Sequence, residues 1–156
     1  MLRWLWLSLL VVLLDQLSKQ VVEMSLLVYE TVAVAPFFNL TLAYNEGAAF
    51  SFLSDQGGWQ RWFFAFTAIL VTLVLTVWLS RLRGERLLAV SLSLVIGGAV
   101  GNLIDRLTFG HVIDFLDFYY GSYHWPAFNL ADIAITCGVI LLFFDALFGA
   151  SARERR

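Results

Sequence analysis

The chain is organised around residues 97–132, which contain the blocks Gly97-Gly98-Ala99-Val100-Gly101-Asn102-Leu103-Ile104-Asp105-Arg106, Val112-Ile113-Asp114-Phe115 and Phe128-Asn129-Leu130-Ala131-Asp132. The first block ends an apolar segment, and the last block begins another. Charged groups at the edges of long hydrophobic segments are costly and usually functional. We therefore look for chemistry in this stretch and read the remaining segments as its support.

The composition is that of an integral membrane protein. The 156 residues are 60% hydrophobic and 14% charged, with a mean hydropathy of +0.79. This is a larger share of apolar residues than one soluble core of ordinary composition can bury. A net charge of −2 gives no indication of a nucleic-acid partner. The single cysteine, Cys137, cannot form an internal disulfide.

Four apolar segments are each long enough to cross the roughly 30 Å of bilayer hydrocarbon as a helix. We place them at residues 4–22, 59–80, 87–106 and 128–148, within one membrane domain that covers residues 1–156. Asp15, Gln16 and Lys19 interrupt the first segment, and no small-x-small cleavage pattern follows it. We therefore interpret it as a retained span rather than a signal peptide.

The basic residues predict how the spans are oriented. One side of the membrane holds both termini and the loop between the second and third spans, with Arg3, Arg81, Arg83, Arg86, Arg153, Arg155 and Arg156. The other side holds or adjoins only Lys19, Arg61 and Arg106. The positive-inside rule then puts both termini in the cytoplasm and residues 23–58 and 107–127 outside.

The first outer segment carries a strand pattern. Apolar and polar residues alternate with a period of two through residues 38–44, between Pro36 and the turn signal Asn45-Glu46-Gly47. We expect residues 48–53 to return as a partner strand, giving a small sheet outside the membrane. The second outer segment is read as a loop rich in tyrosine and tryptophan.

Counting helix rise places the polar residues of the spans at similar depths. Asn102 and Asp105 lie in the last turns of the third span, and Asp132 lies about one turn, or ~6 Å, inside the fourth. Asp15 lies ~10 Å below the outer end of the first span. All of them converge on the outer third of the bilayer.

Helical spacing groups these side chains on shared faces: Gly98, Asn102, Asp105 and Arg106 on one, Asn129 and Asp132 on another, and Asp15 and Lys19 on a third. One reading is that they are polar clamps between helices, because buried polar groups in a membrane must pair and the Gly97-x-x-x-Gly101 pattern permits close packing. The other reading is that they support a functional site. Spacing alone leaves both readings open.

Asp114 and Asp132 differ because neither has a basic residue at helical spacing. Both have apolar neighbours, which disfavour the ionised carboxylate, and two such groups placed together titrate in separate steps. In an aspartic protease dyad the charged carboxylate takes a proton from water and the neutral one donates to the scissile carbonyl. From the residues alone, proton carriage and simple anchoring of the loop stay open as alternatives.

Other nucleophiles fit less well. Cys137 is interpreted as a small core residue, because neither His111 nor His124 lies on a helix that reaches it. A serine/lysine dyad would need Lys19, but Asp15 one turn away favours the protonated ammonium, which is the wrong state for a general base.

A metal site is not expected. His111, Asp114 and His124 are too scattered for a ligand cluster, and no HExxH-like spacing occurs. Asp117 is expected to face water, and Asp145 lies near the cytoplasmic end of its helix. Neither is assigned a role.

These residues match a known family. Over essentially its whole length the chain resembles lipoprotein signal peptidase, also called signal peptidase II, a bacterial inner-membrane aspartic protease. The matching blocks are Asp15-Gln16-Leu17-Ser18-Lys19, Asn45-Glu46-Gly47-Ala48-Ala49-Phe50 and the three blocks quoted above from residues 97–132. Each block is short, but together, in this order on a four-span chain, they make a specific signal.

The resemblance implies that Asp114 and Asp132 are the catalytic dyad. It also implies that other polar positions support the dyad or hold substrate, and Lys19 is placed with them as the neighbour of Asp15. These positions are Asp15, Lys19, Asn45, Gly98, Asn102, Asp105, Arg106 and Asn129.

The resemblance also implies the substrate and the setting. The substrate is a prolipoprotein whose lipobox cysteine carries diacylglycerol, cut on the amino side of that cysteine near the outer face of the inner membrane. The fold is a four-helix membrane protein with a small extracytoplasmic sheet at residues 36–53 and a periplasmic helix or loop. No metal or organic cofactor is expected, the surrounding partners are membrane lipids, and the chain is expected to be a monomer.

The competing class is a small proton-linked carrier or channel subunit, in which carboxylates relay protons across the membrane. That class predicts a polar path through the bilayer. Beyond Asp132, the fourth span offers only Thr136 before Asp145, and the second span is almost wholly apolar. A purely structural subunit would explain the glycines but not two unpaired aspartates.

Overall fold

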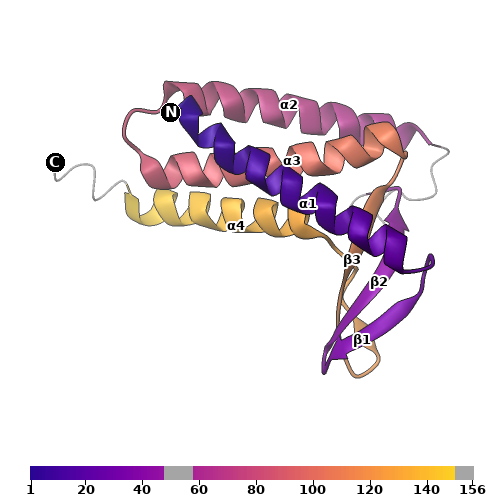
Figure 1. Cartoon of the computed structure of the whole chain (residues 1–156). Coiled ribbons are helices and arrows are strands. Elements are labelled where there is room, and N and C mark those ends of the chain that lie inside the picture. The colour runs from indigo at the N-terminus through magenta and orange to yellow at the C-terminus, as the bar shows by residue number, and fades with distance from the viewer. Residues whose placement is uncertain (48–57, 150–156) are drawn as a thin grey trace.

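Four helices long and apolar enough to cross a membrane lie along one another in the computed structural model, which describes residues 1–47 and 58–149 (Figure 1). They are α1 (Leu5–Ser25), α2 (Trp59–Arg81), α3 (Arg86–Thr108) and α4 (Leu130–Phe144). A 3-10 turn, η1 (Leu2–Trp4), leads into α1, and a π-helical turn, η3 (Asp145–Gly149), follows α4. The four spans predicted from the sequence are confirmed.

α3 is the central helix of the bundle. It packs against α1, α2 and α4. Of an 18-residue apolar stretch in each membrane-spanning helix, 61% is buried in α3, compared with 22% in Leu2–Ser25, 11% in α2 and 17% in Leu130–Phe148. The other three helices therefore leave most of their apolar side chains facing outward, as lipid-facing helices do. Polar residues on α3 are consequently enclosed by its neighbours.

Two glycines let α3 approach the adjacent helices closely. A Cβ atom at Gly98 would collide with the carbonyl oxygen of Ala131 at the start of α4. At Gly101, a Cβ atom would lie 2.6 Å from Oδ2 of Asp15 in α1. Small residues at these positions therefore set the heights at which α1 and α4 pass α3, and Gly101 is one of the two glycines of the Gly97-x-x-x-Gly101 pattern that predicts close packing.

An antiparallel sheet lies across the end of the bundle at which α1 and α3 finish and α4 begins (Figure 1). Its strands are β1 (Thr31–Ala35), β2 (Phe38–Asn45), β3 (Val112–Tyr120) and β4 (Tyr123–His124), in the spatial order β1-β2-β3-β4. The register of β2 and β3 pairs Ala43 with Asp114 and Asn45 with Val112. Two blocks that are far apart in sequence are thereby brought onto adjacent strands.

A small apolar cluster fixes how β3 faces the helices. Val22 of α1, Leu42 of β2 and Ile113 and Phe115 of β3 are buried together. Successive side chains of a strand point to opposite faces, so Ile113 and Phe115 turn Asp114 away from this cluster.

The outer segments differ in part from the expectation. The sequence predicts a loop after α3, whereas residues 112–120 form β3 and pair with β2. Near Asp114 this strand is buried on both faces, which explains why it lacks the alternation of apolar and polar residues that marks β2.

The strand predicted at residues 38–44 is confirmed, and its partners in the described part of the chain are β1 and β3. The predicted partner, residues 48–53, lies outside the described residues. Apart from the last turns of α1 and α3, the described outer residues form strands, turns and extended chain, so no periplasmic helix occurs among them.

Candidate active site

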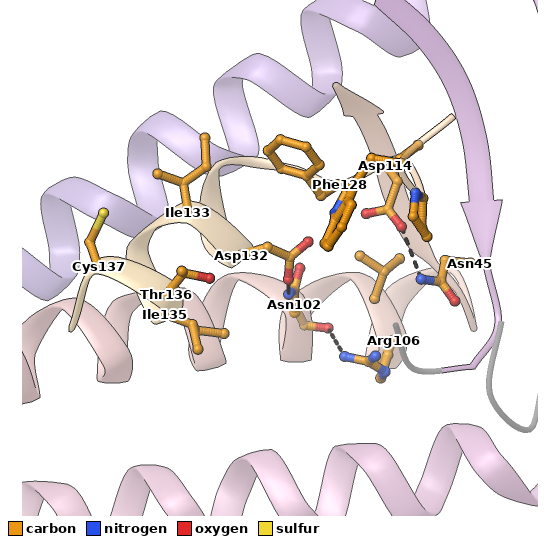
Figure 2. Close-up of a pocket in the computed structure, with 14 residues that line it drawn as sticks. Asn45, Asn102, Arg106, Asp114, Phe128, Asp132, Ile133, Ile135, Thr136 and Cys137 are labelled. Carbon is orange, nitrogen blue, oxygen red and sulfur yellow. Dashed lines mark hydrogen bonds between the residues drawn. The ribbon is translucent and has the colours of Figure 1, made fainter. Parts of the chain in front are cut away.

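A cavity of about 500 Å³ opens where the start of α4 meets β3. Asp114 of β3 and Asp132 of α4 both line it, and Figure 2 shows the two carboxyl groups pointing into the same pocket. Asp114 is only 3% exposed. The two aspartates singled out in the sequence are thus brought together by the pairing of β3 with β2 and by the closeness of α3 and α4.

Asp132 is held in place by the first turn of its own helix. Asn129 is the N-cap of α4, and its Oδ1 accepts a hydrogen bond of 3.0 Å from the backbone N–H of Asp132. In return, Oδ2 of Asp132 accepts a bond of 3.2 Å from the backbone N–H of Asn129. This reciprocal capping box fixes one oxygen of the carboxyl group and leaves Oδ1 to face the neighbouring groups.

Three asparagine amides donate to the two aspartates. Asn102 donates through Nδ2 to Oδ1 of Asp132 at 2.8 Å. Asn129 donates through Nδ2 to Oδ1 of Asp114 at 2.7 Å. Asn45 donates through Nδ2 to Oδ2 of Asp114 at 2.9 Å (Figure 2). Each carboxyl group therefore receives two N–H donors, which is the environment of a held and oriented carboxylate.

The pKa of Asp114 is raised from 3.8 to about 7. Burial is the main cause, because it disfavours the charged carboxylate, and the negative charge of Asp132 adds to it. Hydrogen bonds from Asn45 and Asn129 and the charge of Lys19 act in the opposite direction but do not outweigh burial. Near neutral pH this group can therefore exchange a proton in either direction, as an acid–base catalyst must.

Arg106 lines the same cavity. Its guanidinium donates to the backbone oxygen of Asn102 at 3.3 Å and to the backbone oxygen of Gly47 at 3.1 Å, and it lies 5.2 Å from the centre of the Phe64 ring. These contacts tie α3 to the turn after β2 and to α2. A cation is thereby fixed beside the cavity without being ion-paired to either Asp114 or Asp132.

A buried ionic cluster lies behind the cavity. Lys19 of α1 is 1% exposed, and its Nζ lies 2.8 Å from Oδ2 of Asp15 and 2.7 Å from Oδ2 of Asp105. The same ammonium donates to Oδ1 of Asn102 at 3.0 Å. The Asp15 and Lys19 pair predicted from spacing is confirmed, and α3 supplies the second carboxylate, which helical spacing within α1 could not reveal.

Asp15 and Asp105 also bind backbone groups next to the two cavity aspartates. Oδ1 of Asp15 accepts from the N–H of Ala131 at 3.0 Å, and Oδ2 of Asp105 accepts from the N–H of Ile113 at 3.2 Å. Gln16 donates to Oδ1 of Asp105 at 2.8 Å. Asp15 and Asp105 are therefore both polar clamps between elements and supports of the site, because the backbone groups that they bind belong to the residues immediately before Asp132 and Asp114.

The structure brings the predicted site residues into one region, with Gly98 behind it as a packing contact against Ala131. Gln16 and the backbone of Gly47 also contribute, and both belong to blocks that were already quoted. Trp125 and Thr136 also line the cavity, and this was not predicted, since neither an aromatic residue near a span nor a single threonine within one carries a distinctive signal.

Two sequence interpretations are wrong. Asp117 does not face water: it is 6% exposed, on the strand face opposite to Asp114, and accepts hydrogen bonds from Asn39 at 2.8 Å and His124 at 2.9 Å. Cys137 is not a core residue, because it is exposed and lines the cavity wall. Both errors arise because spacing along one element does not show what the neighbouring element covers.

Comparison with family models gives one match. Residues 7–148 match the model described as signal peptidase (SPase) II. The match covers α2, α3, α4, all of α1 except its first two residues, and all the residues that line the cavity.

Individual proteins agree with this. A lipoprotein signal peptidase from Cupriavidus taiwanensis is 57% identical over 146 residues, which is 94% of this chain and 83% of that protein. One from Burkholderia mallei is 56% identical over 144 residues, covering 92% of this chain and 87% of that protein.

Among solved structures, a bacterial membrane enzyme determined by the in meso method at 2.3 Å resolution is 31% identical, with a TM-score of 0.86 over 99% of this chain and 93% of that one. A second, determined at 1.9 Å, is 32% identical with a TM-score of 0.81, covering 94% of this chain and 93% of that one.

Proposed function

The chain belongs to the signal peptidase II family, which makes it a multi-pass membrane protease that removes signal peptides from prolipoproteins, and from this premise we propose that it is an aspartic endopeptidase with Asp114 and Asp132 as its catalytic dyad. One observation carries the proposal. Two carboxyl groups line one cavity, neither is ion-paired in the described part of the chain, and the pKa of Asp114 is raised to about 7.

The chemistry requires one proton shared between the two aspartates. The ionised carboxylate takes a proton from a water molecule, and the water oxygen attacks the carbonyl carbon of the scissile peptide bond. The protonated carboxyl donates its proton to the carbonyl oxygen, giving a tetrahedral gem-diol. The aspartate that took the proton from water then passes it to the departing nitrogen, and the C–N bond breaks. The other aspartate recovers a proton from a hydroxyl group of the gem-diol.

The substrate is a prolipoprotein whose cysteine carries diacylglycerol, and the bond cut is on the amino side of that cysteine. The cavity supports this choice, because one wall is polar and holds the carboxyl groups while another is formed by apolar side chains of α4, including Ile133 and Ile135. A peptide bond can lie at the polar wall while apolar parts of the substrate contact α4 or the surrounding lipid.

Eight other residues support the dyad or contact substrate. Arg106 lines the cavity with both aspartates, Asn45, Asn102 and Asn129 donate to the carboxyl groups, and the remaining positions hold these residues from behind. The eight are Asp15, Lys19, Asn45, Gly98, Asn102, Asp105, Arg106 and Asn129.

The dyad lies near the outer face of the bacterial inner membrane, with both termini in the cytoplasm. The distribution of arginine supports this orientation. We expect the chain to work as a monomer in contact with membrane lipids and without a metal or organic cofactor. A reporter enzyme that is active only in the cytoplasm, fused to the C-terminus, should be active; an inactive fusion that still accumulates would contradict the orientation.

The test of the dyad is cleavage of a purified prolipoprotein in detergent micelles. We expect Asp114→Asn and Asp132→Asn to abolish turnover while the folded protein still accumulates. Asp117→Asn is the matched control, because it removes another buried carboxylate of the same strand from the opposite face, and it should retain turnover. Substrate without diacylglycerol should not be cut by the wild-type chain. Turnover retained by either dyad variant would refute the assignment.

A further inference from the structure

Lys19 uses all three of its donors on buried acceptors. The ammonium contacts Asp15 at 2.8 Å, Asp105 at 2.7 Å and Oδ1 of Asn102 at 3.0 Å, and the side chain is 1% exposed. A protonated lysine has three N–H donors and no acceptor. The group that meets the third donor must therefore present an oxygen.

That requirement fixes the direction of the Asn102 amide. A primary amide has an oxygen at one corner and an –NH₂ at the other, and the two exchange places when the side chain turns over. Oδ1 of Asn102 also accepts from Nδ2 of Asn129 at 3.2 Å, so two donors converge on it. If the Asn102 amide were turned over, its –NH₂ would face the donors of Lys19 and Asn129, and its oxygen would face Oδ1 of Asp132, which is also an acceptor.

The other two amides that serve the dyad are fixed differently. Oδ1 of Asn129 accepts from the backbone N–H of Asp132 at 3.0 Å, and Oδ1 of Asn45 accepts from the backbone N–H of Gly47 at 3.0 Å. Backbone N–H groups hold these two directions, and a substitution elsewhere does not remove them. Among the three donor amides, Asn102 is the one whose oxygen is held only by side-chain donors, Lys19 at 3.0 Å and Asn129 at 3.2 Å, and Lys19 supplies the shorter and charged bond.

We propose that Lys19 is a positioning residue for catalysis: acting through Asn102, it keeps an N–H donor on Asp132 and so makes Asp132 the ionised member of the dyad at rest. This inference rests on the proposed function, since it presupposes the dyad. A donor to a carboxylate favours its charged form. Asp132 is then the base that takes the proton from water, and Asp114 is the acid that donates to the carbonyl oxygen.

The backbone geometry and the raised pKa of Asp114 agree with this division of roles. The second oxygen of Asp132 also receives a donor, the N–H of Asn129 at 3.2 Å. For Asp114, burial and the negative charge of Asp132 favour the protonated form.

A rival account is that Lys19 acts through space, by its positive charge alone. Asp132 is surrounded by charged and titratable groups from three elements, and any of them contributes to its field. They are Asp15 and Lys19 from α1, Asp105 and Arg106 from α3, and Asp114 from β3. The two accounts differ in whether the effect of Lys19 requires the amide of Asn102.

The test is the pH dependence of kcat for four enzymes: wild type, Lys19→Met, Asn102→Leu and the double variant. Loss of the donor to Asp132 should move the acidic limb of the profile to higher pH, by about one pH unit or more for a hydrogen bond to a charged group. We expect this shift in Lys19→Met and in Asn102→Leu. In the double variant, the shift should equal that of Asn102→Leu alone, because both changes remove the same bond.

Two outcomes would overturn the proposal. If Lys19→Met keeps the wild-type profile, Lys19 is a structural clamp only. If Lys19→Met still shifts the profile when Asn102 is already leucine, its charge acts through space. Lys19→Arg is the control, because arginine, like lysine, has donors and no acceptor. The pH profile of kcat measured for the folded Lys19→Arg protein should match that of wild type.

The variant Asp15→Asn/Lys19→Met/Asp105→Asn covers the case in which Lys19→Met alone fails to fold, because it leaves no unpaired carboxylate in the cluster. Adding Asn102→Leu to this variant should leave its profile unchanged, because the donor to Asp132 is already lost, and a further move of the acidic limb to higher pH would overturn the proposal. Activity of Asp132→Asn would count against the dyad itself, so a failure of the dyad assignment can be told apart from a failure of the role given to Lys19.

Discussion

Replacing Asp114 with asparagine should remove a specific pH dependence from the stability of the folded protein. The pKa of Asp114 is about 7 in the folded protein and 3.8 in an unperturbed chain. Because the folded-state value is the higher one, the native state binds this proton more tightly than the unfolded state does. The resulting stabilisation is complete below the unfolded pKa and is lost as the pH rises through about 7.

The magnitude follows from the two pKa values. Between pH 5 and pH 8 the contribution of Asp114 falls by about 2.5 kcal/mol. For a chain of this length, each kcal/mol corresponds to about 2–4 °C in Tm, so the wild-type Tm should fall by about 5–10 °C more than that of Asp114→Asn over this range. The asparagine also loses one acceptor for Asn45 or Asn129, but that loss is independent of pH and cancels when slopes are compared.

The assay is thermal unfolding in detergent, followed by tryptophan fluorescence at a series of pH values. Asp114→Asn should give the flatter dependence, and above pH 7 its deficit relative to wild type should shrink or reverse. Equal slopes for the two proteins would refute the reasoning, because they would show that Asp114 does not retain a proton in the folded state near neutral pH.

Three further predictions concern activity and packing. Cleavage should slow as the pH rises through about 7, because Asp114 then loses the proton it donates; a pH–rate profile in detergent checks this, and a rate that keeps rising past pH 8 would contradict it. Gly98→Ala should destabilise the fold by about 1–3 kcal/mol and reduce turnover, because the new methyl group meets the carbonyl oxygen of Ala131 next to Asp132; an unchanged Tm would contradict the packing argument. Asn129→Ala should cost about 1–2 kcal/mol as a lost N-cap and should also lower kcat, whereas Asn129→Ser should restore the cap but not the donor to Asp114. Equal turnover in the serine variant and wild type would separate Asn129 from the dyad.

β3, the strand that carries Asp114, was not evident from the sequence. The apolar neighbours of Asp114 marked it as an unpaired carboxylate, but they did not reveal that it lies on a strand. The partner of that strand is β2, whose Ala43 pairs with Asp114 across a long separation in sequence. Strand pairing of this kind depends on how the bundle closes, which no local pattern records.

The ionic cluster of Asp15, Lys19 and Asp105 was also predicted only in part. The spacing of Asp15 and Lys19 was enough to predict that they share a face, because residues four apart on a helix are neighbours. Asp105 joins them only because α1 lies against α3 at the height set by Gly101. Asp117 and Cys137 were misread for the complementary reason, since a neighbouring strand covers the first and no helix covers the second.

The sequence by itself determined the four spans, the strand at residues 38–44, the family and the two candidate aspartates, because hydropathy, periodicity and short blocks are properties of the chain read locally. Only the tertiary structure decided that three asparagine amides donate to Asp114 and Asp132, and that Lys19 is placed behind one of them. Hydrogen-bond direction depends on which donor meets which acceptor across elements, and the packing of α1, α3, α4 and β3 settles that.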